Sequence, residues 1–505
     1  MCVRLGTEKH GTRWIMAAFF TCVIIATDAR AQFAGGSGTA EDPWLVATAE
    51  QLDAVRTNLT AHFRQTADID LGVAPWNEGT GWNPIGTITE GLRFSGRYDG
   101  GGHKISNLTI QRPNAVYQGL FGVLYGGTAQ NLSMINVSVI CERGVNDTLF
   151  IGGLAGYARE ATITGVRLAG AIKGIQYVGG LAGILWDTTL TDSEVVINVE
   201  GREDIGGVAG RMVGTSALDT ASVTGAVKGS TNTGGVMGYI GGGSCRQAWF
   251  DGTVQGGAQA GGVAGYVTGA VTIYHCASRG SVQGTSNVGG LIGYLWLGNP
   301  VVSDCFSRSA VSGATAGGVV GYMRESRIHR CYSTGAVSGS SYAGGLLGRY
   351  YSGTVLDSYW DTEASGQTAS AAGIGRTTDE MLQRATYAGY NFHTLWSIME
   401  GTDYPVLRDL RGYTLRQTVD LAELDGEGTA ESPYIVTTAA ELDAMRQDLA
   451  AHYRMTNDID LAATVLWNAG RGWEAFGTSA APFTGTFDGG GFAVRHLTVN
   501  RPEIT

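Results

Sequence analysis

A fixed pattern of glycine and aliphatic positions recurs through the middle of the chain. Two adjacent glycines are followed by two apolar residues and a third glycine, and successive copies begin 27 or 28 residues apart. The copies begin at Gly152 (GGLAGY), Gly179 (GGLAGI), Gly206 (GGVAGR), Gly234 (GGVMGY), Gly261 (GGVAGY), Gly289 (GGLIGY), Gly317 (GGVVGY) and Gly344 (GGLLGR). Such a period is typical of stacked repeats, in which each unit buries its apolar face against its neighbours.

The pattern within one copy predicts a three-sided coil. Three short runs of β-prone residues and three turns account for about 27 residues, and no copy holds ten residues at helical spacing. We therefore expect an all-β protein, a right-handed parallel β-helix of about nine coils that includes a shorter motif, GLFG, at Gly119. Strand spacing predicts a rod about 43 Å long. Val263, Leu291, Val319 and Leu346 should form one vertical file.

The segments that flank the repeats predict helix-containing caps, which cover the strand edges that the rod would otherwise expose. Residues 32–118 form the predicted N-terminal cap module. Within it, Thr48–Phe63 has the spacing of an amphipathic helix, with Thr48 and Gln51 as a capping box. The predicted repeats occupy 119–365, and the predicted C-terminal cap occupies 366–410.

The N-terminal pattern returns near the end of the sequence. Residues 411–426 are a predicted linker, and 427–505 form a predicted second cap module in which Asp458 and Asp460 repeat the DIDL of the first. The first module enters its coils at the point where the second stops. We therefore expect the sequence to be a truncated part of a longer tandem protein; alternatively, the second module packs on the first rod.

The first 31 residues have the pattern of a secretory signal peptide. Arg4, Lys9 and Arg13 precede an apolar run, Trp14–Ala26, and Ala29–Ala31 supplies a small-X-small cleavage site. The apolar run is shorter than the ~20 residues that a membrane helix needs. We expect a secreted or bacterial cell-surface protein that has no membrane span once the peptide is removed.

Charge and glycine content exclude other classes of protein. The formal net charge is -11 and the pI is near 5.2, whereas a nucleic-acid partner calls for a basic stripe. We therefore expect no nucleic-acid partner. The 79 glycines lack the three-residue period of collagen.

The cysteines and the DIDL aspartates do not indicate a metal site. Five cysteines follow the predicted signal peptide, an odd number that gives no disulfide framework. Cys276, Cys305 and Cys331 share one slot of successive copies and should stack in the core. Zinc ligands usually occur as close pairs with histidine, and Asp68 and Asp70 lack the dense oxygen ligands of a calcium loop. We expect no metal and no cofactor.

These repeats resemble the GLUG motif of bacterial surface proteins, which include adhesin-like proteins and some immunoglobulin A peptidases. The segment from Ser358 to Leu407, SYWDTEASGQ…GRTTDEM…YPVL, is similar to the segment that ends GLUG arrays. The resemblance implies a secreted or surface-attached bacterial protein, often adhesive. The peptidases carry HExxH in a separate domain, and this sequence contains no HExxH, so that activity is not carried over.

One column of charged residues invites a catalytic interpretation. The position before the cysteine slot, predicted to face outward, holds His275, Asp304, Arg330 and Asp357. Two carboxylates two coils apart would lie ~9.6 Å from each other, near the upper limit for inverting glycosidases. However, Arg330 between the aspartates would lower both pKa values, which favours a surface charge ladder. No catalytic residue is therefore predicted.

Exposed aromatic residues are the candidate ligand contacts. Trp186, Trp296 and Tyr351 share the slot seven residues after the first motif glycine and could stack on sugar rings. We expect a non-enzymatic, adhesin-like scaffold that binds carbohydrate or a host or cell-surface protein through its outer face. The alternatives are a carbohydrate-active β-helix enzyme, either a polysaccharide lyase or a glycosidase, and a spacer for a domain beyond Thr505.

Overall fold

The computed structural model describes most of the chain after residue 31. The described residues are 32–113, 115–141, 148–408, 410, 421, 424–461, 464, 473, 475–479 and 481–499. The predicted signal peptide lies outside the described residues, as does most of the predicted linker. Within the described part, no helix combines the length and the apolar character needed to cross a membrane.

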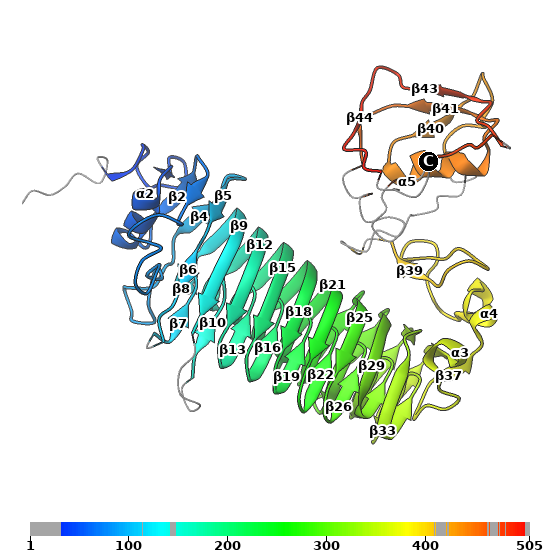
Figure 1. Ribbon diagram of the computed structural model, residues 1–505, viewed down its shortest axis with the longest axis horizontal. Coiled ribbons are helices and arrows are strands. Elements are labelled where there is room, and N and C mark those ends of the chain that lie inside the picture. The colour runs from blue at the N-terminus through cyan, green and yellow to red at the C-terminus, as the bar shows by residue number, and fades with distance from the viewer. Residues whose placement is uncertain are drawn as a thin grey trace, which may run out of the picture.

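The repeats form a parallel β-solenoid of about nine turns, which confirms the predicted fold class (Figure 1). One side of each coil adds a strand to a nine-stranded parallel sheet. Its strands are β8 (Phe121–Tyr125), β11 (Ala155–Arg159), β14 (Ala182–Trp186), β17 (Ala209–Val213), β20 (Met237–Ile240), β23 (Ala264–Thr268), β27 (Ile292–Trp296), β30 (Val320–Arg324) and β34 (Leu347–Tyr350).

The other two sides of the coils belong to a second, larger sheet. Its long strands are β9 (Thr128–Ile140), β12 (Thr162–Lys173), β15 (Thr189–Glu200), β18 (Ala217–Lys228), β21 (Gly243–Gln255) and β29 (Phe306–Gly317). Its shorter strands in the coils are β7 (Tyr117–Gln118), β10 (Phe150–Ile151), β13 (Gln176–Gly179), β16 (Glu203–Gly206), β19 (Thr231–Gly234), β22 (Gln259–Gly261), β24 (Val271–Tyr274), β25 (Ala277–Gln283), β26 (Asn287–Gly289), β28 (Val301–Ser303), β31 (Ser326–His329), β32 (Tyr332–Ser333), β33 (Val337–Gly344), β35 (Gly353–Leu356) and β36 (Tyr359–Asp361).

The motif glycines allow neighbouring coils to approach closely. A Cβ built on Gly261 would lie 2.6 Å from the carbonyl oxygen of Leu291 in the next coil. A Cβ on Gly262 would lie 2.3 Å from the carbonyl oxygen of Gly290, and one on Gly265 would lie 2.4 Å from the nitrogen of Thr233. Real Cβ atoms do not approach backbone atoms so closely, so no residue with a side chain fits at any of the three motif glycines.

The residues between these glycines form the predicted single file. The backbone amide of Val263 donates to the carbonyl of Leu291, that of Leu291 to Val319, and that of Val319 to Leu346, at 2.8–2.9 Å. All four side chains are buried. An inward column on another side holds the predicted stack of Cys276, Cys305 and Cys331, which are buried free thiols. The interior is thus built from vertical columns of small apolar side chains.

The N-terminal cap covers the first coil, and its helix is shorter than predicted. Helix α2 spans Ala49–Ala54, and a 3-10 turn follows over Val55–Thr57. The helix ends there because Asn58 leaves the helical conformation and His62–Gln65 pairs as strand β2. The cap strands are β1 (Trp44–Val46), β2, β3 (Ile69–Asp70), β4 (Arg97–Asp99), β5 (Lys104–Ser106) and β6 (Thr109–Ile110).

The predicted capping box of α2 is also altered. The Thr48 hydroxyl accepts from the amide of Gln51, but the Gln51 side chain accepts from the amide of Ala47 rather than that of Thr48. The cap still satisfies two amides at the start of the helix.

The C-terminal cap covers the last coil and also returns along the side of the rod. Its elements are α3 (Thr362–Ser365), β37 (Ile374–Arg376), α4 (Thr378–Met381) and the antiparallel pair β38 (Trp396–Ser397) and β39 (Val406–Leu407). We call residues 381–410 the strap. Its aromatic side chains share one buried cluster with Trp249, Phe306, Tyr332 and Tyr359, which lie in different coils of the rod.

The second cap module repeats the first around its own core. It contains β40 (Tyr434–Val436), α5 (Ala439–Ala444), β41 (His452–Met455), β42 (Ile459–Asp460), β43 (Thr486–Asp488) and β44 (Val494–Arg495). In the first module β9 covers Tyr98 and Ile105, which are buried. The corresponding Phe487 and Val494 are about 40% exposed.

Candidate functional site

The outer side of the nine-stranded sheet carries two parallel columns that are rich in aromatic and arginine side chains, and we call this side the aromatic face. The first column is Val123, Tyr157, Ile184, Arg211, Tyr239, Tyr266, Tyr294, Tyr322 and Arg349. The second column lies two residues further along each strand, and it contains all three aromatic residues predicted from the sequence.

Four consecutive tyrosines of the first column stack on one another. The ring centroids are 5.4 Å apart for Tyr239 and Tyr266, 5.3 Å for Tyr266 and Tyr294, and 4.8 Å for Tyr294 and Tyr322. Burial, together with the neighbouring Tyr322 and Tyr266, raises the pKa of Tyr294 to about 12. Because ring faces meet each other, the stack presents a row of edges and hydroxyls at the spacing of the coils.

An arginine closes each end of this tyrosine stack. The Arg211 guanidinium lies 4.3 Å from the centroid of Tyr239, and that of Arg349 lies 5.6 Å from Tyr322. Each contact adds a cation–π attraction of about 0.5–1 kcal/mol at an exposed site. The tyrosine stack is therefore a rigid unit with a cation at each end.

The three predicted aromatic residues lie in the second column, but they do not stack on one another. Arg159 lies between Tyr125 and Trp186, at 5.3 and 5.2 Å from their centroids. Arg324 lies between Trp296 and Tyr351 in the same way, at 4.6 and 4.8 Å. Trp186 and Tyr351 remain 41% and 62% exposed.

These two sandwiches limit the predicted stacking on sugars. In each of them, a guanidinium already covers one face of the aromatic ring. Trp296 is further occupied by Tyr294, whose ring lies 5.0 Å away at 20°. Stacking of Trp186, Trp296 and Tyr351 on a glycan stays a prediction, and it is now restricted to the ring faces and edges that arginine leaves open.

A buried carboxylate holds Arg211 at the base of the aromatic face. The Asp204 side chain is fully buried, and its Oδ2 lies 2.8 Å from the Nε of Arg211. The Asn232 amide donates to Asp204 Oδ1 at 2.7 Å. Burial raises the pKa of Asp204 to about 6 although Arg211 acts to lower it. Desolvation therefore outweighs the ion pair at this site.

The acidic residues considered for catalysis lie under or beside the strap. Asp304 is buried, accepts two hydrogen bonds from Arg330 (2.7 and 2.6 Å), and accepts a third from Trp396 of the strap. The prediction that Asp304 faces solvent is therefore wrong, because the strap covers that part of the rod. Arg330 pairs with Asp304, whereas Asp357 contacts His329 Nε2 at 3.0 Å.

This charged column also marks a bend in the coil. The residues there have left-handed backbone with φ of 45–65°. They are Asn131, Gly165, Asp192, Thr220, Gln247, His275, Asp304, Arg330 and Asp357. A groove lies at the first residues of this bend, and we call it the corner groove. Over the later coils, the strap packs against the same side of the rod.

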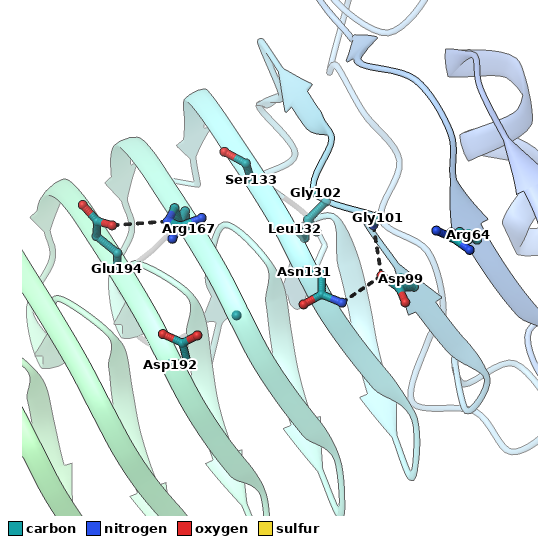
Figure 2. Close-up of a pocket in the computed structure, with 11 residues that line it drawn as sticks. Arg64, Asp99, Gly101, Gly102, Asn131, Leu132, Ser133, Arg167, Asp192 and Glu194 are labelled. Atoms are coloured by element: carbon teal, nitrogen blue, oxygen red, sulfur yellow. Dashed lines mark hydrogen bonds and ion pairs between the residues drawn. The ribbon is translucent and has the colours of Figure 1, made fainter. Parts of the chain in front are cut away.

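Over the first coils, the corner groove is open and polar (Figure 2). It encloses about 440 Å³ and crosses β2, β4, β9, β12 and β15. Figure 2 shows Ser133, Arg167 and Glu194 in one row and Asp99, Asn131 and Asp192 in the other. Arg64 stands at the N-terminal end of the groove.

The DIDL aspartates organise turns. Asp68 accepts from the amide of Lys104 at 3.0 Å, and this hydrogen bond lowers its pKa. Asp70 accepts from the Asn107 side chain at 2.7 Å and from the amide of Gly72 at 2.8 Å. In the described parts of the chain, no three His, Cys, Asp or Glu side chains gather as a metal site would require.

Sequence reasoning missed most of the aromatic face, although its signal is present. The residue after the motif's third glycine is tyrosine in five of the eight copies quoted above, and it supplies the tyrosine stack. Arg159 and Arg324 occupy the same slot as Trp186 and Trp296. The strap gave no such signal, because its position depends on where the chain returns after the last coil. The groove gave none because it follows a backbone bend that different residue types share.

Comparisons with known proteins give partial matches. No known family model matches the chain. A segment covering 26% of the chain is 39% identical over 139 residues to Halomucin of Haloquadratum walsbyi, of which it spans 2%. A segment covering 22% of the chain is 42% identical over 113 residues to a protein of Evansella cellulosilytica named "Putative Gly-rich membrane protein", of which it spans 13%. The chain thus spans a small share of each relative.

A comparison with solved structures gives a further likeness. A structure described as a "putative immunoglobulin A1 protease" from Bacteroides ovatus is 20% identical, and the match covers 75% of this chain and 95% of that one. The TM-score is 0.31, so the likeness carries no argument about function.

Proposed function

We propose that this protein is a non-enzymatic β-helical scaffold of the cell surface, adhesin-like, that binds a host or cell-envelope ligand through its aromatic face. The stack of four tyrosines and the two sandwiches of tyrosine, arginine and tryptophan beside it carry this proposal. These three residue types are enriched at protein interfaces and dominate their binding energy. One relative's name describes a membrane protein, which supports a surface location. Membership of the GLUG repeat proteins is part of the same proposal.

The mechanism rests on rigidity. Side chains in register on stacked strands lose little further conformational freedom when a ligand binds, so many modest contacts can add to useful affinity. Stacked rings and cation–π contacts already fix the rotamers of Tyr239, Tyr266, Tyr294 and Tyr322. The rod therefore presents a pre-organised strip to a large partner.

The test compares beads coated with the wild-type protein and with a Tyr266→Ala, Tyr294→Ala variant. Retention is measured on immobilised fibronectin, collagen, mucin and bacterial cell-wall sacculi. The proposal expects retention on at least one surface, and a several-fold loss in the variant. Val196→Ala, an exposed apolar residue of the other sheet, is the matched control. Equal retention of all three proteins, or none on any surface, would overturn the proposal.

A further inference from the structure

The corner groove differs in chemistry from the part of the same side of the rod that the strap covers. Under the strap, the wall column consists mainly of aromatic side chains such as Phe306 and Tyr332, whose rings stack at 5.3 Å. In the corner groove the same column holds Ser133, Arg167 and Glu194. The same side of the rod is therefore covered by apolar packing along the later coils, and it is accessible and polar along the first.

Gly165 opens the floor of this polar groove. It is the only glycine in the left-handed column at the bend, between Asn131 and Asp192 in the neighbouring coils. A Cβ at Gly165 would lie 3.2 Å from Asn131 Oδ1. The missing side chain leaves a cradle between two rows of polar groups. In all the other coils of this column, a side chain occupies the bend.

The lining alternates hydrogen-bond donors and acceptors. Arg64 and Arg167 supply guanidinium donors, and Asp192 and Glu194 supply carboxylate acceptors. Arg167 Nε lies 3.3 Å from Glu194 Oε2, and both side chains are more than half exposed, so this pair can rearrange around a ligand. Asp99 is occupied by the amide of Gly101 and the side chains of Gln130 and Asn131; it stiffens the wall.

We infer that the open corner groove binds a linear, uncharged oligosaccharide. Sugar hydroxyls both donate and accept, which suits a lining of interleaved arginines and carboxylates. Three carboxylates against two arginines disfavour an anionic chain, and the absence of aromatic residues from this lining disfavours an apolar peptide anchor. From β2 to β15 the groove spans four strand spacings, roughly 19 Å, which is long enough for several sugar units. This site is separate from the aromatic face.

The test is titration calorimetry of the full chain with cellohexaose, mannohexaose and the acidic hexagalacturonate. The key variant is Gly165→Asn, which fills the cradle with a residue that tolerates left-handed backbone and already occupies this column at Asn131. Thr220→Asn makes a similar change in the same column outside the groove, and it is the matched control. Circular dichroism checks that both variants keep the fold.

We expect a neutral hexasaccharide to bind the wild type and Thr220→Asn equally, and Gly165→Asn to bind it at least about tenfold more weakly. Arg167→Gln should also weaken binding, because it removes charged donors without filling the cradle. The inference is overturned if neither neutral sugar binds, if Gly165→Asn binds as tightly as the wild type, or if hexagalacturonate is preferred. The bead assay on the aromatic-face variant is independent of each outcome.

Discussion

The buried pair below the aromatic face makes a quantitative prediction about pH. Asp204 is enclosed by Arg211, Asn232 and the neighbouring acid Glu203. Its pKa rises from the ordinary 3.8 to about 6. The folded protein therefore holds the Asp204 proton more tightly than the unfolded chain does. This contribution to stability is complete below pH 3.8 and is lost as the pH rises through 6.

The magnitude follows from the size of the pKa change. Each pKa unit corresponds to 1.36 kcal/mol, so the carboxylate costs about 3 kcal/mol of folding free energy once it is ionised. The side chain is fully buried, so solvent does not screen this cost. Asp204→Asn removes the titrating group and keeps a side chain of the same shape.

Urea unfolding followed by far-UV circular dichroism at pH 3.5 and pH 7 measures the effect. From pH 3.5 to pH 7, the free energy of unfolding of Asp204→Asn should rise by about 3 kcal/mol relative to that of the wild type. A constant offset from the lost ion pair does not change this difference. Asp251→Asn, at a partly exposed aspartate, is the control and should show a far smaller change. A difference between Asp204→Asn and the wild type that does not depend on pH would refute the argument that Asp204 is a desolvated carboxylate.

Three further predictions concern packing. Gly262→Ala places a Cβ against the carbonyl of Gly290 and should cost about 1–3 kcal/mol in urea unfolding, whereas Ser281→Ala in the same coil should cost under about 0.5 kcal/mol; equal costs would contradict the close approach of coils. Trp396→Ala removes a fully buried strap side chain and should lower the free energy of unfolding by about 3–5 kcal/mol. It should also expose the strap, residues 381–410, to protease, whereas the control Tyr351→Ala should not. A strap that stays uncut in Trp396→Ala would count against its packing on the rod. Thr438→Ala removes the α5 cap and should destabilise the second cap module by about 1 kcal/mol, leaving the unfolding of the rod unchanged; a joint shift would show that the two share one core.

The sequence predicts the rod because a period of 27 or 28 residues constrains every coil in the same way. Val263 and its equivalents could be assigned to one file, since each sits between glycines that admit no side chain. The helix at Thr48 was overestimated, because Leu59 and Phe63 continue a helical spacing although Asn58 ends the helix and Phe63 lies in β2.

The candidate sites were harder to predict because they depend on contacts between distant segments. The exposure of Asp304 was misjudged because Trp396, 92 residues later, folds back over it. The bend column was recognised as a column of charges, but its left-handed backbone, which creates the corner groove, has no sequence signature in residues as different as Thr220 and Arg330. Trp186 and Trp296 were predicted as exposed aromatic residues, but the arginines that cover them were not predicted.

The most direct test of the account is the spacing of spin labels along one outward column. Lys173, Gln283 and Ser312 share one such column. Gln283 lies four coils from Lys173, and Ser312 lies five coils from Lys173. The five cysteines that follow residue 31 are buried and should not take up label. Double electron–electron resonance on the pairs Lys173→Cys/Gln283→Cys and Lys173→Cys/Ser312→Cys should give roughly 19 and 24 Å, one strand spacing apart. Distances that do not increase by one spacing per coil would contradict the stacked register on which the aromatic face and the corner groove both depend.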